Sequence, residues 1–241
     1  MNKPTRALNA LGVLGGMGPL ATVDFLKKLI EETPATRDQE HIPVIVYSVP
    51  QIPDRPLAIA GDGESPLPHM LEGIHTLKRA GATAIAIACN TAHFWYRDLV
   101  EQGGLPILNI ADAACAALPS SIIRVGLIAT QGTVAAGIYQ ARFAARQLDY
   151  RLSSDSDQHT LVLPAIECVK RNDLAQAHAL ATQAVRHLLD QGAQAIVLGC
   201  TEIPLAIEHQ PLDVSAHCID ATRALARACV AWWHAPSARN T

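Results

Sequence analysis

The sequence lacks the features that mark several classes of protein. Its 19 Lys and Arg residues against 22 Asp and Glu residues give a net charge of −3, so there is no basic excess for binding nucleic acid. No apolar run reaches the roughly 18 residues of a membrane span, and no secretory apolar segment follows the N-terminus. We therefore expect a protein that binds neither nucleic acid nor membrane.

The six cysteines also lack the spacings of common structural sites. None forms a C-x-x-C pair or the Cys/His spacing of a zinc site, so we expect no structural metal. With no export signal we expect a cytoplasmic protein, in which thiols stay reduced. A length of 241 residues with 49% hydrophobic content is enough for one large core or two small ones.

What the sequence does contain is an internal repeat with a cysteine in each copy. Residues 80–91 align without gaps with residues 191–202, which places Cys89 opposite Cys200 at an offset of about 111 residues. In both copies Gly-Ala follows a predicted helix, and an apolar run predicts a buried strand that ends at the cysteine. Any two parallel α/β units share some likeness, but the ungapped match favours two homologous halves.

The apolar pattern predicts alternating strands and helices. The expected strands are residues 8–14, 44–49, 84–88, 107–110, 125–129, 150–153 and 195–198, with another around residue 214. The expected helices are residues 19–33, 67–79, 92–102, 133–147, 174–191 and 221–233. This pattern predicts an α/β fold of two pseudo-symmetric domains, each a mainly parallel sheet flanked by helices. The domains would be residues 1–112 plus 217–241 and residues 113–216, with the active site in the cleft between them.

Cys89 and Cys200 are the strongest catalytic candidates. Each ends a predicted strand and begins a turn into a helix, where backbone N–H groups and the helix dipole favour thiolate and lower its pKa. Two thiols at the carboxyl ends of parallel strands can reach one substrate from opposite faces. A proton can then be removed from one face and returned to the other. The remaining cysteines are expected to be small buried hydrophobic residues: Cys115, Cys168, Cys218 and Cys229.

Polar residues directly follow both cysteines. The hydroxyl, amide and backbone donors of Asn90, Thr91 and Thr201 suit a substrate carboxylate between the thiols, although they could also cap the next helices. His93 could orient a base or merely pack. Glu202 could tune the protonation of the neighbouring thiol or lie on the surface.

Two other segments carry candidate ligands. Residues 16–21 match G-x-G-x-x-A, but no acidic residue follows the second strand to hold a ribose, so a glycine turn that approaches a small carboxylate fits better than a dinucleotide site. Residues 50–56 are expected to form a rigid, proline-rich loop that presents Arg55, whose guanidinium offers the bidentate fork that a carboxylate prefers. Taken alone, Lys170 would be an ordinary surface cation.

Four motifs in order give the chain a family resemblance. They are Gly-Gly-Met-Gly-Pro at 15–19, Pro-Gln-Ile-Pro-Asp-Arg at 50–55, Cys-Asn-Thr-Ala-His at 89–93 and Gly-Cys-Thr-Glu at 199–202. Together they resemble the aspartate/glutamate racemase family, and most closely its cofactor-independent aspartate racemases. The resemblance implies Cys89 and Cys200 as an acid/base pair, with Arg55 and Lys170 holding the side-chain carboxylate. The predicted substrate-binding set is completed by Met17, Gly18, Asp54, Asn90, Thr91, Thr133, Thr201 and Glu202.

The resemblance implies cofactor-independent racemisation of an acidic amino acid, aspartate first, by a homodimer. Glutamate racemase, broad-specificity amino-acid racemase and maleate isomerase remain open, because Arg55 indicates a second acidic group without separating these activities. Two alternatives lie outside this superfamily's isomerase chemistry: a catalytically silent carboxylate-binding protein and a thiol redox protein. The bulky residues 94–96 after His93 depart from the family pattern and leave the side-chain preference open.

Overall fold

Two four-stranded parallel sheets form the framework of the computed structural model, which describes residues 9–209 and 213–235. The first sheet has the order β2-β1-β3-β4 and the second the order β6-β5-β7-β8. The strands of the first are β1 (Ala10–Gly15), β2 (Val44–Ser48), β3 (Ala82–Ile87) and β4 (Ile107–Leu108). Those of the second are β5 (Arg124–Ala129), β6 (Asp149–Leu152), β7 (Ala195–Gly199) and β8 (Cys218–Asp220). The matching orders confirm an α/β fold of two similar halves.

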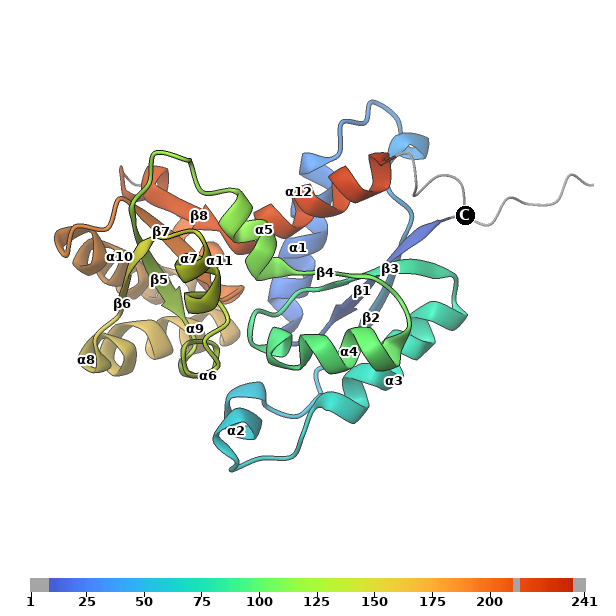
Figure 1. The fold of residues 1–241 in the computed structure, drawn as a ribbon, viewed down its shortest axis with the longest axis horizontal. Coiled ribbons are helices and arrows are strands. Elements are labelled where there is room, and N and C mark those ends of the chain that lie inside the picture. Colours follow the sequence, from blue (N-terminus) through green and yellow to red (C-terminus); the bar gives the residue numbers. More distant parts are fainter. Residues whose placement is uncertain (1–8, 210–212, 236–241) are drawn as a thin grey trace, which may run out of the picture.

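Helices cover both sheets. The first sheet carries α1 (Pro19–Glu32), α3 (Leu67–Arg79), α4 (Tyr96–Gly103) and α5 (Ile110–Ala116), with the short α2 (Arg55–Ala60) at its end. The second carries α6 (Gln131–Ala135), α7 (Gln140–Ala145), α8 (Asp155–Asp157), α9 (Leu163–Lys170), α10 (Leu174–Asp190) and α11 (Glu202–Glu208). The last helix, α12 (Ala221–His234), crosses back to the first half and lies beside α1 and α5 (Figure 1).

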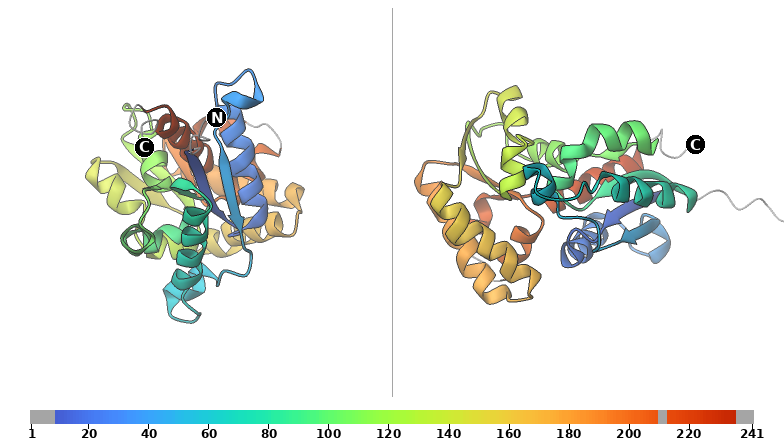
Figure 2. Two further views of the ribbon diagram at one scale, coloured as in Figure 1. Left: turned by 90° about the vertical axis from the view of Figure 1, so that its right-hand side faces the viewer. Right: turned by 90° about the horizontal axis from the view of Figure 1, so that it is seen from below.

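The two halves share one hydrophobic core at the seam between them. Alternate residues of β1 point to opposite faces, so that Leu11 packs in this shared core while Leu14 packs beneath α3 and α4. The shared core continues into the second half through Val125 and Phe143. The right-hand view of Figure 2 shows the resulting pair of lobes from below. Because residues of both halves are buried in this one core, the core holds the two sheets together.

Several predicted elements differ from the structure. The helix expected at 133–147 is two short helices, since Gly137 between them adopts a left-handed φ of 66°. The strand expected around residue 214 is a 3-10 turn (Asp213–His217), and β8 follows it. The strand expected at 107–110 ends early because Asn109 caps α5. The helix expected at 92–102 begins with a 3-10 turn, Thr91–Trp95. Residue 8 of the first expected strand lies outside the described residues.

The domain boundaries at 112/113 and 216/217 stay predictions. In the structure α5 packs against α12 of the first half, and β8 pairs with β7 of the second sheet. Within the described ranges, no helix combines the length and the apolar character needed to cross a membrane.

Candidate active site

The two predicted catalytic cysteines follow equivalent strands. Cys89 comes after β3 and Cys200 after β7. These two strands hold the same place in their sheets, β3 beside β1 and β7 beside β5. Both are buried, with 5% and 4% of their surface exposed. Both also line one cavity of about 30 Å³ between the two halves. The structure thus brings the paired thiols to one enclosed space.

The cavity collects most of the predicted substrate-binding residues. The predicted residues in its wall are Met17, Asp54, Arg55, Cys89, Asn90, Thr91, Lys170, Cys200, Thr201 and Glu202. Gly18 and Thr133 lie just behind it. A Cβ at Gly18 would be 3.3 Å from Glu202 Oε1, and Thr133 Oγ1 is 2.9 Å from Thr91 Oγ1. Ten of the predicted residues, from both halves, therefore line a space that holds about one water.

A buried histidine fixes the turn that carries Cys89. His93 Nδ1 lies 2.9 Å from the carbonyl oxygen of Cys89, and the N–H of Ile110 donates to Nε2 at 3.2 Å. The second bond makes Nε2 an acceptor, so Nδ1 carries the hydrogen and donates. Burial lowers the pKa of His93 to about 4. Because both ring nitrogens are bonded to backbone, His93 packs and orients the turn, and it does not act as a base on a thiol.

Arg55 brings a positive charge into the cavity. It begins α2 and does not lie in a loop as predicted, because the exposed Asp54 caps the helix by accepting from Leu57 N at 2.9 Å. The guanidinium Nη1 donates to the carbonyl oxygens of Ile52 and Pro53, while the buried Nε has no partner. In the part of the chain that the structure describes, no carboxylate pairs with Arg55. An unneutralised guanidinium beside the thiols suits an acidic ligand.

Three threonine hydroxyls join the two halves beside Cys89. Thr91 Oγ1 lies 2.9 Å from both Thr130 Oγ1 and Thr133 Oγ1, and these two lie 3.0 Å from each other. Thr130 caps α6 and also lines the cavity. Lys170 contributes from the last position of α9, where it is exposed at the cavity wall. Residues from both halves are therefore needed to complete the site.

Comparison with known proteins decides the family. The sequence profile described as Asp/Glu/Hydantoin racemase matches residues 14–229. The chain belongs to this racemase family. The aspartate racemase of Picrophilus torridus is a similar solved structure, with a TM-score of 0.78 and 31% identity over 95% of this chain and 94% of that one. The broad specificity amino-acid racemase RacX of Bacillus subtilis (strain 168) is 25% identical over 226 residues, 91% of this chain and 96% of that protein.

A third relative has another named substrate. The glutamate racemase of Pseudomonas entomophila (strain L48) is 31% identical over 235 residues, which cover 90% of this chain and 78% of that enzyme. These matches confirm the resemblance carried by the four motifs, and they identify the chain as an isomerase of the amino-acid racemase type.

The thiols of the racemase have unequal surroundings. Burial raises the pKa of the Cys89 thiol, and the Arg55 guanidinium offsets part of that rise. Burial raises the pKa of the Cys200 thiol well above its ordinary value, and the Glu202 carboxylate adds to the rise. The Cys200 thiol donates to Glu202 Oε2 at 3.1 Å. The predicted lowering of both pKa values is therefore wrong for this closed arrangement, because desolvation outweighs the nearby backbone donors.

The glycine turn of the racemase serves packing. Gly16 has a φ of 89°, and a Cβ there would lie 2.5 Å from the backbone of Val49. Its N–H donates to Thr22 Oγ1 at 2.9 Å, so this N–H is not available to a carboxylate, while the approach of the other N–H groups of the turn stays a prediction. Close backbone packing explains the G-x-G-x-x-A pattern without a dinucleotide.

Sequence reasoning missed three residues of the cavity wall: Pro56, Thr130 and Ile166. Pro56 directly follows Arg55 in the same motif region, and Thr130 directly follows the expected strand at residues 125–129. Those two positions were therefore accessible from the sequence. Ile166 lies on α9, in a helical segment that the sequence did not predict. No pattern in the sequence points to it.

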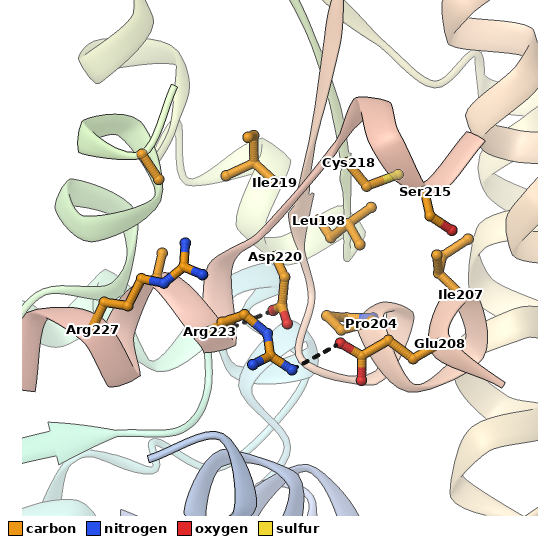
Figure 3. A pocket seen from close by; sticks show the side chains of 12 residues that line it. Leu198, Pro204, Ile207, Glu208, Ser215, Cys218, Ile219, Asp220, Arg223 and Arg227 are labelled. Atoms are coloured by element: carbon orange, nitrogen blue, oxygen red, sulfur yellow. Dashed lines mark hydrogen bonds and ion pairs between the residues drawn. The ribbon is translucent and has the colours of Figure 1, made fainter. Parts of the chain in front are cut away.

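A roomier cavity of about 300 Å³ lies away from the cysteines, between α11, β8 and α12 (Figure 3). Its charged lining residues are already paired, because Arg223 contacts Glu31, Glu32 and Glu208. Arg227 likewise pairs with Glu32. Cys218 is the one cysteine among the described residues of its wall, so the larger cavity lacks the pair Cys89 and Cys200 and also lacks an unpaired arginine, and the chemistry favours the small cavity. Among the described residues no group of His, Cys, Asp and Glu is arranged to hold a metal.

Proposed function

We propose that this racemase interconverts the enantiomers of an acidic amino acid, aspartate first, without a cofactor. Cys89 and Cys200 transfer the proton. One thiolate removes the α-proton from one face, and the opposite thiol delivers a proton to the other face. The reverse reaction exchanges the two roles. The observation that carries this proposal is the pair of buried thiols on equivalent strands, lining one cavity with an unpaired arginine.

The side-chain carboxylate of the substrate is assigned to binding by Arg55 and Lys170. The Arg55 guanidinium is held by two carbonyl oxygens and keeps an unpartnered buried Nε, which suits a carboxylate oxygen. Lys170 reaches the same cavity from the second half. The α-carboxylate is assigned to the amide of Asn90 and the donors at Thr91 and Thr201, which surround the thiols. Met17, Gly18 and Thr133 shape the walls, and Asp54 holds the start of α2.

The chemistry demands an enclosed site because the α-proton of an amino-acid carboxylate is a very weak acid. Without a cofactor to spread the carbanion charge, fixed donors in a water-poor cavity must stabilise it. Ligand pockets usually measure 300 Å³ or more, so a cavity of about 30 Å³ represents a closed arrangement. An amino acid needs more room than this, so the halves separate to admit it and then close around it, less tightly than here, for proton transfer.

Other substrates of the same superfamily remain alternatives with specific support. Similarity to RacX over 91% of this chain favours a broad-specificity racemase, and similarity to a glutamate racemase favours a longer acidic side chain. A maleate isomerase would share the thiols and the need for two carboxylates. A silent carboxylate-binding protein would bind these ligands without turnover.

A substrate panel tests the proposal. Purified protein with no added cofactor, in the presence of a chelator and hydroxylamine, is incubated with the L-enantiomers of aspartate, glutamate, asparagine and alanine. Chiral chromatography should show racemisation of aspartate with the highest kcat/KM, and asparagine and alanine should be poor substrates. A requirement for metal or pyridoxal phosphate, or equal rates with alanine, would contradict the proposal. Isomerisation of maleate instead would assign the alternative activity.

We also propose a cytoplasmic homodimer. All six cysteines are free thiols, which suits a reducing compartment. Val23 and Ile30 of α1 are about three-fifths exposed, and Val46 of the edge strand β2 is 42% exposed, so this face offers an apolar surface for a second copy. Light scattering should give the mass of two chains, and the mass of one chain at micromolar concentration would contradict the dimer.

A further inference from the structure

One buried tyrosine contacts a residue next to each of the two cysteines. Tyr139 lies just before α7 and is fully buried. Its hydroxyl is 2.5 Å from Oδ1 of Asn90, the residue after Cys89. On the other side its ring contacts Gly199, the residue before Cys200, where an added Cβ would lie 3.0 Å from Tyr139 Cε2. The sequence motifs gave no indication of this residue.

The tyrosine hydroxyl determines which way the Asn90 amide faces. Burial raises the pKa of Tyr139 well above its ordinary value, so the hydroxyl keeps its proton and donates it to Asn90 Oδ1. If the amide were reversed, Nδ2 would donate to the hydroxyl oxygen, and the phenolic hydrogen would lose the acceptor it has in the structure. The hydroxyl therefore favours the orientation in which Oδ1 is bonded and Nδ2 is free.

That orientation leaves a donor for the ligand. Asn90 is 2% exposed, and its Nδ2 is buried without a hydrogen-bond partner. Asn90 also lines the cavity between the thiols. A buried amide donor without a partner is unfavourable, so Asn90 Nδ2 is a group for which an acceptor is expected. A carboxylate oxygen supplies the acceptor that Nδ2 lacks.

We propose that Tyr139 is a positioning residue for the racemase reaction, orienting Asn90 towards the substrate carboxylate and supporting the end of β7 before Cys200. The proposal rests on the proposed function, because the carboxylate it presents is that of the amino acid. Tyr139 touches neither the substrate nor the reacting atoms. It acts through the residues next to the two thiols.

The same contact links substrate binding to closure of the two halves. Asn90 follows β3 of the first sheet, whereas Tyr139 follows β5 of the second. Their hydrogen bond therefore forms only when the halves meet. Opening the cleft to admit an amino acid separates the pair, and closing it restores the amide orientation. The donor is thus aligned at the stage when water has been excluded.

Removing only the hydroxyl tests the role. Tyr139→Phe keeps the ring against Gly199 but leaves Asn90 Oδ1 unsatisfied, so kcat/KM for aspartate should fall about 10- to 100-fold. Tyr150→Phe is the matched control. Tyr139 and Tyr150 both pack against Phe143, at ring-centroid distances of 5.9 and 6.0 Å, but Tyr150 is 37% exposed and outside the site. The control should change kcat/KM less than about twofold.

A double-mutant cycle separates positioning from a general loss of structure. If Tyr139 acts through Asn90, adding Tyr139→Phe to Asn90→Ala should lower kcat/KM by less than about twofold more. If the second substitution still costs its full 10- to 100-fold, the hydroxyl acts elsewhere and the proposal is overturned. An unchanged kcat/KM in Tyr139→Phe alone would also overturn it.

A measurement without turnover keeps this inference distinct from the proposed activity. The side-chain amide of Asn90 can be followed by ¹⁵N NMR, assigned with Asn90→Ala. Tyr139→Phe should shift or broaden its resonances, whereas Tyr150→Phe should leave them in place. Unchanged resonances would overturn the positioning role. If the resonances move but the parent racemises nothing, the proposed function fails while the contact that orients Asn90 stands.

Discussion

Neighbouring charges distinguish the two cysteines, which otherwise occupy equivalent positions. The Arg55 guanidinium favours the thiolate of Cys89, and the Glu202 carboxylate accepts the proton of the Cys200 thiol in a hydrogen bond. Burial disfavours both thiolates, so Cys89 is the easier of the two to ionise. Cys89 is therefore expected to lose its proton before Cys200 does.

Arg55 provides the residue-scale test of substrate class. Arg55→Ala should lower kcat/KM for aspartate about 10- to 100-fold, since it removes charge-assisted hydrogen bonds to the side-chain carboxylate. Arg55→Lys should recover only part of this loss because an ammonium lacks the planar fork. Steady-state kinetics on aspartate, glutamate, asparagine and alanine measure the effect. Arg79→Ala, an exposed arginine of α3, is the control. Equal losses on acidic and neutral substrates would give Arg55 a structural role.

At the scale of single elements, the sequence predicted strands better than short helices. The apolar runs before Cys89 and Cys200 predict β3 and β7 because each is a continuous buried strand. The helix α2 was missed because its Pro-rich start reads as a loop, although Asp54 is a capping residue. The segment from α8 to α9 was also missed, since its helix is interrupted by a π-helical turn. Ile166, which lies on α9, was therefore not predicted as a residue of the site.

The turn between β3 and the 3-10 segment is stabilised by a neutral histidine. Burial lowers the pKa of His93 to about 4, below the 6.5 of the free side chain. The unfolded chain therefore binds a proton at a higher pH than the folded chain, and stability is lost as the pH falls from about 6.5 towards 4. At pH 5 this amounts to about 2 kcal/mol relative to pH 7.5.

Urea unfolding of the parent and His93→Gln at those two pH values isolates this contribution. The parent should lose about 2 kcal/mol more free energy of unfolding between pH 7.5 and pH 5 than the variant does. His75→Gln, an exposed histidine of α3, should behave like the parent. Identical losses in parent and His93→Gln would show that His93 is not held neutral by the fold.

At the scale of the whole molecule, the repeat in the sequence predicted two halves. The contacts that hold the two halves together could not be predicted from the sequence. The buried Lys28 of α1 illustrates the difference. It lies 2.7 Å from Asp24 of the same helix, 2.7 Å from Asp220 before α12 and 3.4 Å from Glu208 of α11. In the sequence, Asp24 and Lys28 read as an ordinary pair on a helix surface. Burial of the pair depends on α12 returning across α1, which no local pattern specifies.

Lys28→Met should destabilise the molecule by about 3–5 kcal/mol, because it leaves buried carboxylates without a counter-charge. Denaturant unfolding measures the change. Lys27→Met is the control from the adjacent position: Lys27 is 68% exposed and lies 3.6 Å from Glu31, so its loss should cost under about 1 kcal/mol. Similar small effects for both substitutions would show that the ion-pair cluster does not hold the halves together.

The central claim is that two opposed thiols transfer the proton, and isotope incorporation tests it most directly. L-aspartate is incubated with the enzyme in deuterated water, and product and remaining substrate are separated early in the reaction. If one thiol removes the proton and the other delivers one equilibrated with solvent, D-aspartate should carry deuterium while recovered L-aspartate keeps its α-proton. Cys89→Ala and Cys200→Ala should each abolish the product. Protium in the D-aspartate, or near-parent racemisation by either variant, would contradict the account.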